Sequence, residues 1–509
     1  MNDTGAVDFI VNGDPVSVPA AGSLLDALRE SLHLTGAKDG CSPQGQCGCC
    51  TVWVDGQPRV ACVTPVTRVR GRSVTTIEGL DVADAWGEAF ACHGASQCGF
   101  CTPGIIMRAA ALDDTKRSNP AAVAQSLLAH QCRCTGWQSV VAAIADGPDA
   151  PCAAPAARAA ERAAIEGRVP QAVGPQVALG HGGFADDTAP VGALVALRGS
   201  DGEWVVGETL HEARELSGKV QGRRTTAPLG WPVDVPDGDW VRTLQTTWVE
   251  PGYLEPDASW CEPGGEPMSS YGNGGAFGGK QSGVLGAVAR ELADRHGRPV
   301  RVISTREDVV RFGPKRPPIG AGLRADGTGV VHVARTAGVA DAIGAAAPGL
   351  DVVEVDVIGP ATSVDLRGAG TIEALVLLAS LQPGPEFEVT TPEGATARAT
   401  VGDDGAITVE VSCGEVLDAV VLESYCVGAA HMALGWVTSE GVSIGDDGEP
   451  HDLTMRSFGV LRAVDTPPIA VTIRDGDGPP VNGSDAVFAA VATAAWHGSG
   501  WASRWPTDH

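Results

Sequence analysis

The sequence predicts an α+β protein of several domains, in which two small cysteine-rich domains precede a longer mixed α and β region. The chain has 509 residues, which is more than a single hydrophobic core usually supports. Ten of its 14 cysteines fall before residue 135, most of them one to five residues apart. From about residue 171 onward, short strands and helices alternate in the hydrophobic pattern. We therefore expect four segments, which are residues 1–80, 81–150, 151–170 and 171–509.

Composition and charge exclude several classes of partner. Hydrophobic residues make up 43% of the chain, and we expect no apolar run near the roughly 18 to 20 residues that cross a bilayer. Lys and Arg total 36 against 62 Asp and Glu, so the net charge of −26 repels nucleic acid and anionic membranes. The start of the chain lacks the pattern of a secretory signal. We expect a soluble cytoplasmic protein in which disulfides are not the default.

The clustered cysteines form two groups with the spacing of metal sites. The first group has the spacing C-x5-C-x2-C-x11-C, and the second has C-x2-C followed after 30 residues by C-x-C. In a reducing compartment such groups bind metal. A structural zinc site is one alternative, but it usually shows C-x2-C twice. A long loop with three cysteines and a fourth from a nearby strand suits a binuclear iron–sulfur core better.

The residues around the first group predict a ferredoxin-like order of elements. Residues 7–18 alternate in hydrophobicity around Asn12-Gly13, which is typical of a β-hairpin. Ser23 can cap the helix that follows. The apolar stripe of that helix comprises Leu24, Ala27, Leu28 and Leu32. Bare glycines in the cysteine loop leave room for backbone N–H groups to face an anionic cluster.

The residues around the second group predict a small helical bundle. Thr102 can cap a helix that Pro103 opens, so two cysteines lie just before the helix N-terminus, where its dipole favours negative charge. Asn119-Pro120 begins another helix, which we expect to end near Gln131. Thr135 can cap a third helix.

Three stretches resemble the iron–sulfur region of the molybdenum hydroxylases, the xanthine dehydrogenase and aldehyde oxidase family. They are Gly-Gln-Cys-Gly-Cys-Cys-Thr-Val, Gln-Cys-Gly-Phe-Cys-Thr-Pro-Gly and Cys-Arg-Cys-Thr-Gly-Trp. The resemblance implies two [2Fe–2S] clusters, one held by Cys41, Cys47, Cys50 and Cys62 and the other by Cys98, Cys101, Cys132 and Cys134. It also places Gln97 and Cys134 where the family touches its pterin cofactor. Cys49 has no ligand role in the family, and we expect a small buried residue there.

Residues 171–509 resemble a shortened molybdopterin-binding region, after a Pro and Ala-rich connector over 151–170. The stretches that carry the resemblance are Tyr253-Leu254-Glu255-Pro256, Gly274 to Lys280, and Leu366 to Gly370. In the family the arginine of the last stretch, here Arg367, lines the substrate pocket. We also expect a helix at 287–296, a strand at 299–303 and strands within 386–411.

The glycine-rich loop at 274–280 has three interpretations. Its residue spacing nearly matches the phosphate-binding loop motif, but Gln281 replaces the Ser or Thr that binds Mg²⁺ in that motif. It could also be a plain flexible loop. The favoured interpretation is a backbone cradle beside a pterin–metal centre, formed by Gly275, Ala276, Phe277 and Gly278, because bare amides can approach an oxo group or phosphate closely.

The chain departs from the family at the catalytic base. In the family, a glutamate in a Gly-Glu-Pro-Pro stretch takes a proton from a metal-bound hydroxide. Here Gly478 takes the place of that glutamate and has no carboxylate. The nearby acids Asp475, Asp477 and Asp485 are expected to be solvated turn residues. His431 is expected to be packed in a helix.

Two functional hypotheses follow. In the favoured one, the chain is the electron-transfer component of a hydroxylase: its clusters pass electrons from a separate molybdenum subunit to a flavin subunit, and its C-terminal region serves for docking. In the alternative, the chain is a compact hydroxylase of aldehydes or N-heterocycles with its own molybdopterin and with Arg367 orienting the substrate. FAD is expected on a partner only, because the chain has no dinucleotide-binding signature. A third and disfavoured hypothesis is a structural protein whose two cysteine groups bind zinc.

Overall fold

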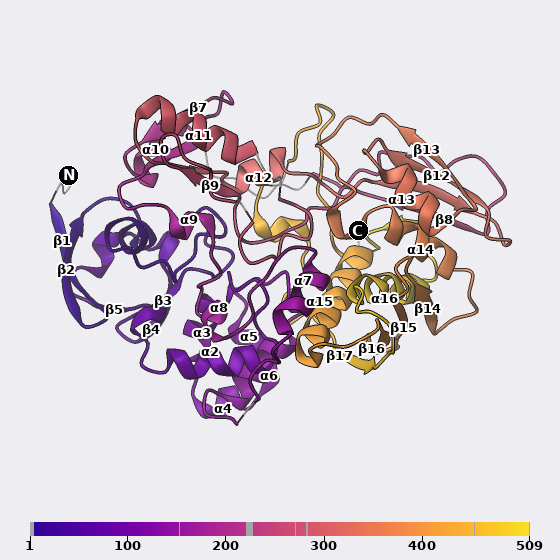
Figure 1. Cartoon of the computed structure of the whole chain (residues 1–509), viewed down its shortest axis with the longest axis horizontal. Helices are drawn as coiled ribbons and strands as arrows, with labels where there is room; N and C mark the ends of the chain where they lie inside the picture. The colour runs from indigo at the N-terminus through magenta and orange to yellow at the C-terminus, as the bar shows by residue number, and fades with distance from the viewer. Residues whose placement is uncertain are drawn as a thin grey trace.

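Four β-sheets with covering helices organise the part of the chain that the computed structural model describes, which is residues 5–151, 153–219, 227–269, 271–280, 284–451 and 453–507. The first sheet and a group of short helices form the N-terminal third, and the other three sheets follow along the chain (Figure 1). The α+β architecture expected from the sequence is confirmed.

The first sheet has the strand order β2-β1-β5-β3-β4. Its strands are β1 (Ala6–Val11), β2 (Asp14–Pro19), β3 (Thr51–Val54), β4 (Gln57–Val60) and β5 (Ser73–Thr75). The predicted hairpin is confirmed, because β1 and β2 pair antiparallel around Asn12-Gly13. Ser23 caps α1 (Leu24–Asp26) through a capping box with Asp26, and the chain continues as the π-helix η1 (Ala27–Ser31). Short 3₁₀ helices follow at η2 (Ala61–Val63), η3 (Val66–Val69) and η4 (Ile77–Gly79).

The predicted helical bundle is present, but two of its expected caps are wrong. Its helices are α2 (Ala83–Cys92), α3 (Thr102–Ala109), α4 (Asp114–Arg117), α5 (Pro120–Ser126) and α6 (Gln138–Asp146). Asn119 caps α5, which ends before Gln131. Thr102 lies inside α3, where its hydroxyl is 3.1 Å from that of Ser96. Thr135 does not cap α6: Trp137, with a φ of 71°, is the residue before the helix, and the Thr135 hydroxyl accepts from the Trp137 N–H (3.4 Å) and lies 3.3 Å from Cys132 Sγ.

The expected connector over 151–170 contains a helix, α7 (Ala159–Gly167). Its Arg162 and Glu166, one turn apart, are both fully buried and form an ion pair of 2.8 Å. Glu166 also accepts hydrogen bonds from the backbone N–H groups of Gly483 (3.0 Å) and Ser484 (2.9 Å). The segment therefore anchors the start of a C-terminal helix, and the Ala-rich composition that suggested a connector instead suits helix formation.

The second sheet has the order β7-β6-β10-β9 and lies beside the first domain. Its elements and neighbours are α8 (Pro175–Ala178), α9 (Ala185–Thr188), β6 (Leu194–Arg198), β7 (Trp204–Gly207), α10 (Leu210–Ser217), β9 (Ala258–Cys261), α11 (Val284–His296), β10 (Val300–Ile303) and α12 (Arg306–Phe312). The predicted helix at 287–296 and the strand at 299–303 are confirmed by α11 and β10. Arg29 of the first domain pairs with Asp186 and Asp187 of α9, each at 2.7 Å, and these buried contacts fix the domain against the sheet.

The third and fourth sheets form the C-terminal half, with the orders β13-β12-β11-β8-β18 and β14-β15-β16-β17. The third contains β8 (Arg242–Thr246), β11 (Ile319–Leu323), β12 (Gly329–Ala334), β13 (Leu350–Val355) and β18 (Arg504–Trp505), with α13 (Val339–Ala346), η5 (Leu366–Gly368) and α14 (Thr371–Ala379). The fourth contains β14 (Phe387–Thr390), β15 (Thr396–Val401), β16 (Ile407–Ser412) and β17 (Ile469–Arg474), and η6 (Met455–Phe458) precedes β17. The strands expected within 386–411 are thereby confirmed.

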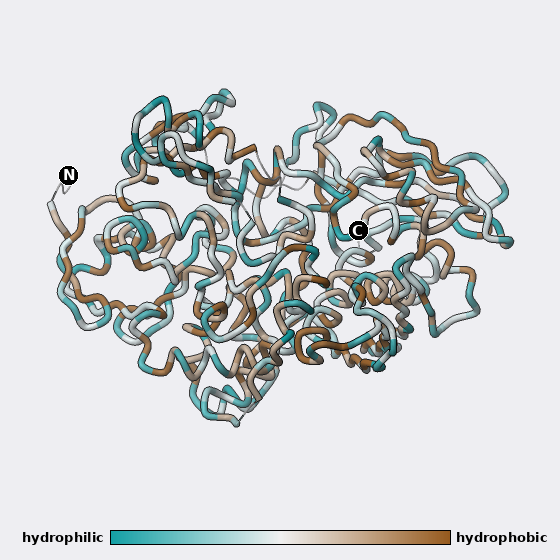
Figure 2. The backbone as a smooth tube through the Cα atoms, viewed as in Figure 1, coloured by the Kyte–Doolittle hydropathy of each residue, from teal (hydrophilic) through white to brown (hydrophobic). Residues whose placement is uncertain are grey.

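Two long helices, α15 (Ala419–Thr438) and α16 (Ser484–Gly498), pack side by side at the centre of this half (Figure 1). Contrary to the expectation from composition, α15 is long and apolar enough to cross a membrane, but 83% of its apolar window is buried inside the protein. Figure 2 shows hydrophilic turns at the periphery of the molecule. His431 lies buried in α15, as predicted, and its Nε2 is 3.2 Å from the carbonyl oxygen of Leu461.

Candidate functional site

The second cysteine group converges at one point between α3 and the turn before α6. Cys98 and Cys101 precede α3, and Cys132 and Cys134 lie on the turn. The Sγ atoms of Cys98 and Cys134 are 3.6 Å apart. Hydrogen bonds from the thiols of Cys101 and Cys134 lower the pKa of Cys132 well below its usual value. The four buried thiols therefore lie together at one site.

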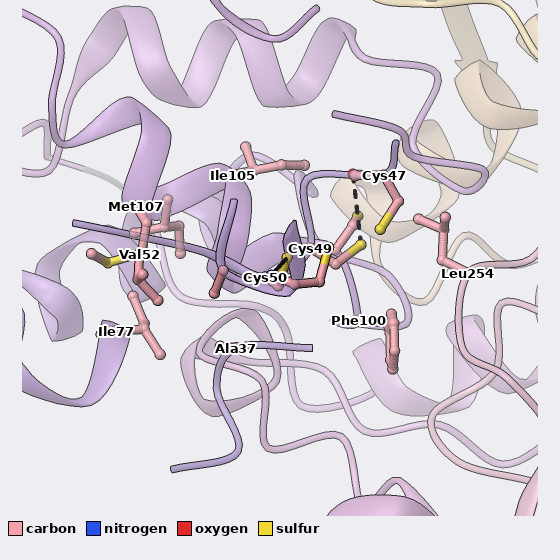
Figure 3. Packing of buried hydrophobic residues seen from close by; sticks show 14 of the residues in the cluster. Ala37, Cys47, Cys49, Cys50, Val52, Ile77, Phe100, Ile105, Met107 and Leu254 are labelled. Atoms are coloured by element: carbon pink, nitrogen blue, oxygen red, sulfur yellow. Dashed lines mark hydrogen bonds between the residues drawn. The ribbon is translucent and has the colours of Figure 1, made fainter. Parts of the chain in front are cut away.

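The first cysteine group converges in the same way inside the first domain. Hydrogen bonds with the thiols of Cys47 and Cys62 lower the pKa of Cys41 well below its usual value. The backbone N–H of Cys62 lies 3.4 Å from Cys50 Sγ. A Cβ atom on Gly40 would lie 3.2 Å from Cys47 Sγ, so any larger residue would crowd this side of the group. Figure 3 shows Cys47, Cys49 and Cys50 packed together, with Phe100 and Leu254 nearby.

The arrangement of the thiols fits binuclear clusters. Each group supplies four buried thiols that lie together, which is the number that the two irons of one cluster require. A zinc site needs three or four ligands around one ion, whereas each iron of a [2Fe–2S] cluster takes only two protein thiolates. Cys49 is fully buried beside the first group, as expected for a small packed residue, and its Sγ is 3.7 Å from the carbonyl oxygen of Cys47.

The backbone joins the two cysteine groups directly. The N–H of Gln131, the residue before Cys132, donates a 2.9 Å hydrogen bond to the carbonyl oxygen of Cys47. Beside this contact, the buried ring of His130 lies 3.2 Å from both the Thr51 hydroxyl and the Gly104 carbonyl oxygen. Cys47 of the first group and Cys132 of the second are therefore linked by one hydrogen bond and the single residue Gln131.

The glycine-rich loop lies against the second cysteine group. A Cβ atom on Gly275, whose φ is +81°, would lie 2.7 Å from Cys98 Cβ and 3.4 Å from Cys134 Sγ. Asn273 Nδ2 donates to the carbonyl oxygen of Gln97 (3.2 Å), and Gln97 Nε2 donates to that of Cys134 (3.0 Å). The structure thus brings together three residues predicted for the pterin site, Gln97, Cys134 and Gly275.

On its other side the loop lines a cavity of about 200 Å³. Ala276, Phe277, Gly278 and Arg367 all contribute to its wall. A Cβ atom on Gly278 would lie 2.2 Å from the carbonyl oxygen of Asp365, so the bare loop can press against the segment that carries Arg367. The backbone N–H of Arg367 donates to the carbonyl oxygen of Phe277 (3.0 Å). The four predicted loop residues and Arg367 are therefore neighbours, whereas Gln97 does not line this cavity.

The acids near the C-terminus differ from the prediction. Asp485 is not a solvated turn residue: it lies in the first turn of α16, is buried, lines the cavity and forms an ion pair with Arg168. Sequence reasoning missed it because its burial depends on α7 and the glycine loop, which are distant in the chain. Asp475, Asp477 and Gly478 are exposed, and Gly478 does not line the cavity. Gln281 lies outside the described residues.

Between the loop and the second cysteine group, Glu255 forms a buried ion pair with Lys280. Burial raises the pKa of Glu255 to about 7 against the attraction of Lys280. Both residues lie in motifs singled out from the sequence. The sequence carries no signal for their pairing, because 24 residues of loop and strand separate them.

We expect substitution of Glu255 by glutamine to change how stability depends on pH. A carboxyl group whose pKa is raised by folding stabilises the fold while protonated, and this contribution is lost as the pH rises through about 7. Glutamine cannot ionise. The free energy of unfolding of the variant, relative to the wild type, should therefore rise by up to about 3 kcal/mol between pH 4.5 and pH 8. Urea unfolding of both proteins at a series of pH values measures this, and a constant difference would contradict it.

Two family models match the N-terminal part of the chain. Residues 9–67 match a "2Fe-2S iron-sulfur cluster binding domain", and residues 76–145 match a "[2Fe-2S] binding domain". Nicotine 6-hydroxylase small subunit from Paenarthrobacter nicotinovorans is 40% identical over 152 residues, which are 29% of this chain and 92% of that protein. Isoquinoline 1-oxidoreductase subunit alpha from Brevundimonas diminuta is 40% identical over 144 residues, which are 27% of this chain and 94% of that protein.

The whole chain has the fold of a solved structure. Aldehyde oxidoreductase from Desulfovibrio gigas aligns with a TM-score of 0.66 and 16% identity, and the alignment covers 96% of this chain and 97% of that one. The two family models and these relatives define an oxidoreductase of the iron–sulfur class with two [2Fe–2S] clusters. The chain belongs to the xanthine dehydrogenase and aldehyde oxidase family of molybdenum hydroxylases.

Proposed function

We propose that this chain is a compact molybdenum hydroxylase that carries its own molybdopterin cofactor and passes the electrons of its substrate through both clusters to a flavin partner. The observation that carries the proposal is the position of the glycine loop, with Gly275 against Cys98 on one side and Phe277 lining the cavity on the other. A cofactor held by this loop would lie next to the second cluster. This proposal replaces the preference drawn from the sequence, in which the C-terminal region serves for docking.

The proposed ligands of the clusters are the two cysteine quartets predicted from the sequence. Their buried thiols contact one another within each quartet, which fits two thiolates on each iron. For the pterin cofactor we propose a cradle of Gly275 to Gly278, with contacts from Gln97 and Cys134 on the cluster side of the loop, outside the cavity that Phe277 and Gly278 line. When bound, the cofactor would supply the two-electron hydroxylation chemistry. The chain's own residues would hold it and orient the substrate through Arg367, and the two clusters would accept its electrons one at a time.

The electron-transfer component remains a second candidate. The two relatives described above are subunits by name, and this chain covers 92% and 94% of them with its cluster domains. The exposed Gly478 also leaves the family's base position without a carboxylate. In this candidate a separate molybdenum subunit would supply the electrons. Both candidates need an FAD-bearing partner and a small-molecule substrate, and for both a cytoplasmic location is a prediction.

Metal analysis of the purified chain distinguishes the two candidates. We expect about four irons and one molybdenum per chain, together with extractable pterin, because the proposal gives the chain two binuclear clusters and one cofactor. Four irons without molybdenum or pterin, from cells that make the cofactor, would favour the electron-transfer component. Zinc alone in an anaerobically reconstituted sample would contradict both.

A further inference from the structure

A second cavity, of about 40 Å³, shares Phe277 and Arg367 as lining residues with the larger one. Its apolar wall comprises Val249, Pro251, Leu366, Met432, Trp436 and Phe488. One water molecule needs about 10 to 15 Å³ of such space and two or more polar partners, whereas pockets for organic ligands are several times larger than this cavity. The smaller cavity therefore has room for water but not for a substrate with a ring.

Glu250 offers this cavity a carboxylate without hydrogen bonds. The residue is 1% exposed, and in the part of the chain that the structure describes neither of its carboxylate oxygens accepts a hydrogen bond. Lys315 Nζ lies 2.9 Å from Oε2, which compensates the charge, but the same Nζ donates to the carbonyl oxygen of Gly313 (2.7 Å). Buried polar atoms that lack a protein partner usually contact bound water or a ligand. We therefore expect water at the Glu250 carboxylate.

The other buried acids that line the two cavities are engaged by arginines. The pairs are Glu166 with Arg162, Glu440 with Arg133 and Asp485 with Arg168. A further lining cation of the smaller cavity, Arg316, is held by Glu373 in the same way. Of these buried acids around the loop, Glu250 is thus the one whose oxygens are open to water.

The proposed hydroxylation needs a proton acceptor, because the exposed Gly478 stands at the family's base position. We propose that Glu250 takes this role: it holds a water molecule in the smaller cavity and accepts one of its protons while the oxygen is transferred to the substrate. This inference rests on the proposed function. Phe277 and Arg367 line both cavities, so the water lies beside the loop and beside the arginine that would orient the substrate.

The step balances with water as the source of oxygen. R–H and H₂O give R–OH, two protons and two electrons. The C–H bond and one O–H bond break, and a C–O bond forms. Glu250 takes the proton of the broken O–H bond, and the proton from the C–H bond goes to solvent. The two electrons pass through the clusters to the flavin partner, which is the oxidant in the proposed function.

The water site can be tested without turnover. A crystal structure of the chain with both clusters should show an ordered water within hydrogen-bond distance of a Glu250 carboxylate oxygen. The double variant Glu250→Leu with Lys315→Met replaces the buried pair by apolar side chains, so its cavity should be dry and no charge is left uncompensated. A dry cavity in the wild type would overturn the inference.

The catalytic role is measured by mixing the molybdenum-loaded chain with substrate in the absence of the flavin partner. Benzaldehyde and isoquinoline are the probes, one for each expected substrate class, and bleaching of the cluster absorbance reports the arriving electrons. In Glu250→Gln the limiting rate should fall about a hundredfold to ten-thousandfold, which is the usual contribution of a general base, with little change in the half-saturating concentration. Formate should restore part of the rate in Glu250→Ala, because it brings a small carboxylate into the vacated space.

The matched control is Asp418→Asn. Asp418 is 5% exposed, lines neither cavity and accepts hydrogen bonds from the backbone N–H groups of Ala156 and Val421, both at 2.8 Å. This variant should keep the wild-type rate. Every variant should keep the wild-type iron and molybdenum content, and the double variant, which should be equally slow, serves as the test if Glu250→Gln does not fold.

The outcomes separate this inference from the proposed function. Bleaching of Glu250→Gln at the wild-type rate would overturn the inference and leave the proposed function standing. A slow Glu250→Gln variant without rescue of Glu250→Ala by formate would also overturn it, because the carboxylate would then act through the structure alone. A chain that holds no molybdenum, or a loaded chain that reacts with neither probe, defeats the proposed function and the catalytic role of Glu250 with it.

Discussion

Replacing Cys132 with serine is expected to remove one of the two [2Fe–2S] clusters and to leave the other in place. The Cys132 thiol contacts those of Cys101 and Cys134, and hydrogen bonds from both lower its pKa well below the usual value. Serine is a poor iron ligand at neutral pH, because its hydroxyl does not ionise there as a thiol in this setting does. The iron content should fall by about half, and one of two reduced-state EPR signals should disappear. In the proposed function, electron flow from the cofactor to the flavin partner would then stop at the missing cluster.

A matched control is Cys49→Ser. This cysteine is equally buried and lies beside the first group, but it has no proposed ligand role. The variant should keep both EPR signals and all of its iron, with at most a modest loss of stability from burying a hydroxyl beside the Cys47 carbonyl oxygen. If Cys132→Ser loses both signals while the chain stays folded, the division of the cysteines into two separate quartets is wrong.

Replacing Glu440 with alanine is expected to give the largest loss of stability among single substitutions outside the cysteine groups. Glu440 and Arg133 are 1% and 6% exposed, and the Arg133 Nη2 to Glu440 Oε2 distance is 2.7 Å. Removing one member of a buried ion pair leaves the other charge uncompensated, which costs about 3 to 5 kcal/mol. Arg133 stands between two cysteines of the second group, so that cluster should be lost at a lower temperature than the first.

Thermal unfolding, followed by circular dichroism and by cluster absorbance, measures both effects. Glu410→Ala is the control, because Glu410 pairs with Arg474 at 2.9 Å on the surface, where a salt bridge contributes at most about 1 kcal/mol. A loss in Glu440→Ala that is no greater than in this control would show that Arg133 finds another partner or water.

The parts of the molecule that the sequence predicts correctly are those whose signals are local. Asn12-Gly13 defines its hairpin, Asn119 caps its helix, and the close spacing of the cysteines within each half of a group indicates a shared site. Thr102 and Thr135 have the right residue type for a cap, but their hydroxyls bond to Ser96 and Cys132 instead, and no local pattern reveals such competition.

The cavity could be predicted only in part, for the same reason. The glycine loop and Arg367 appear as motifs, so the resemblance to the family places them. Asp485 and Glu166 reach the cavity from α16 and α7, and their burial depends on tertiary packing between segments more than 300 residues apart. A single acid in a polar stretch gives no sign of that packing, and a turn in water is then the simplest interpretation.

The hydrogen bond from the Gln131 N–H to the Cys47 carbonyl oxygen involves main-chain atoms alone. Every residue type except proline at 131 can make it, so this contact between the two cluster domains does not depend on which side chains line the seam. Substitutions there can change how tightly the domains pack while the distance between the two cysteine groups stays the same. Only a proline at 131 or a shift of the loop would remove the bond.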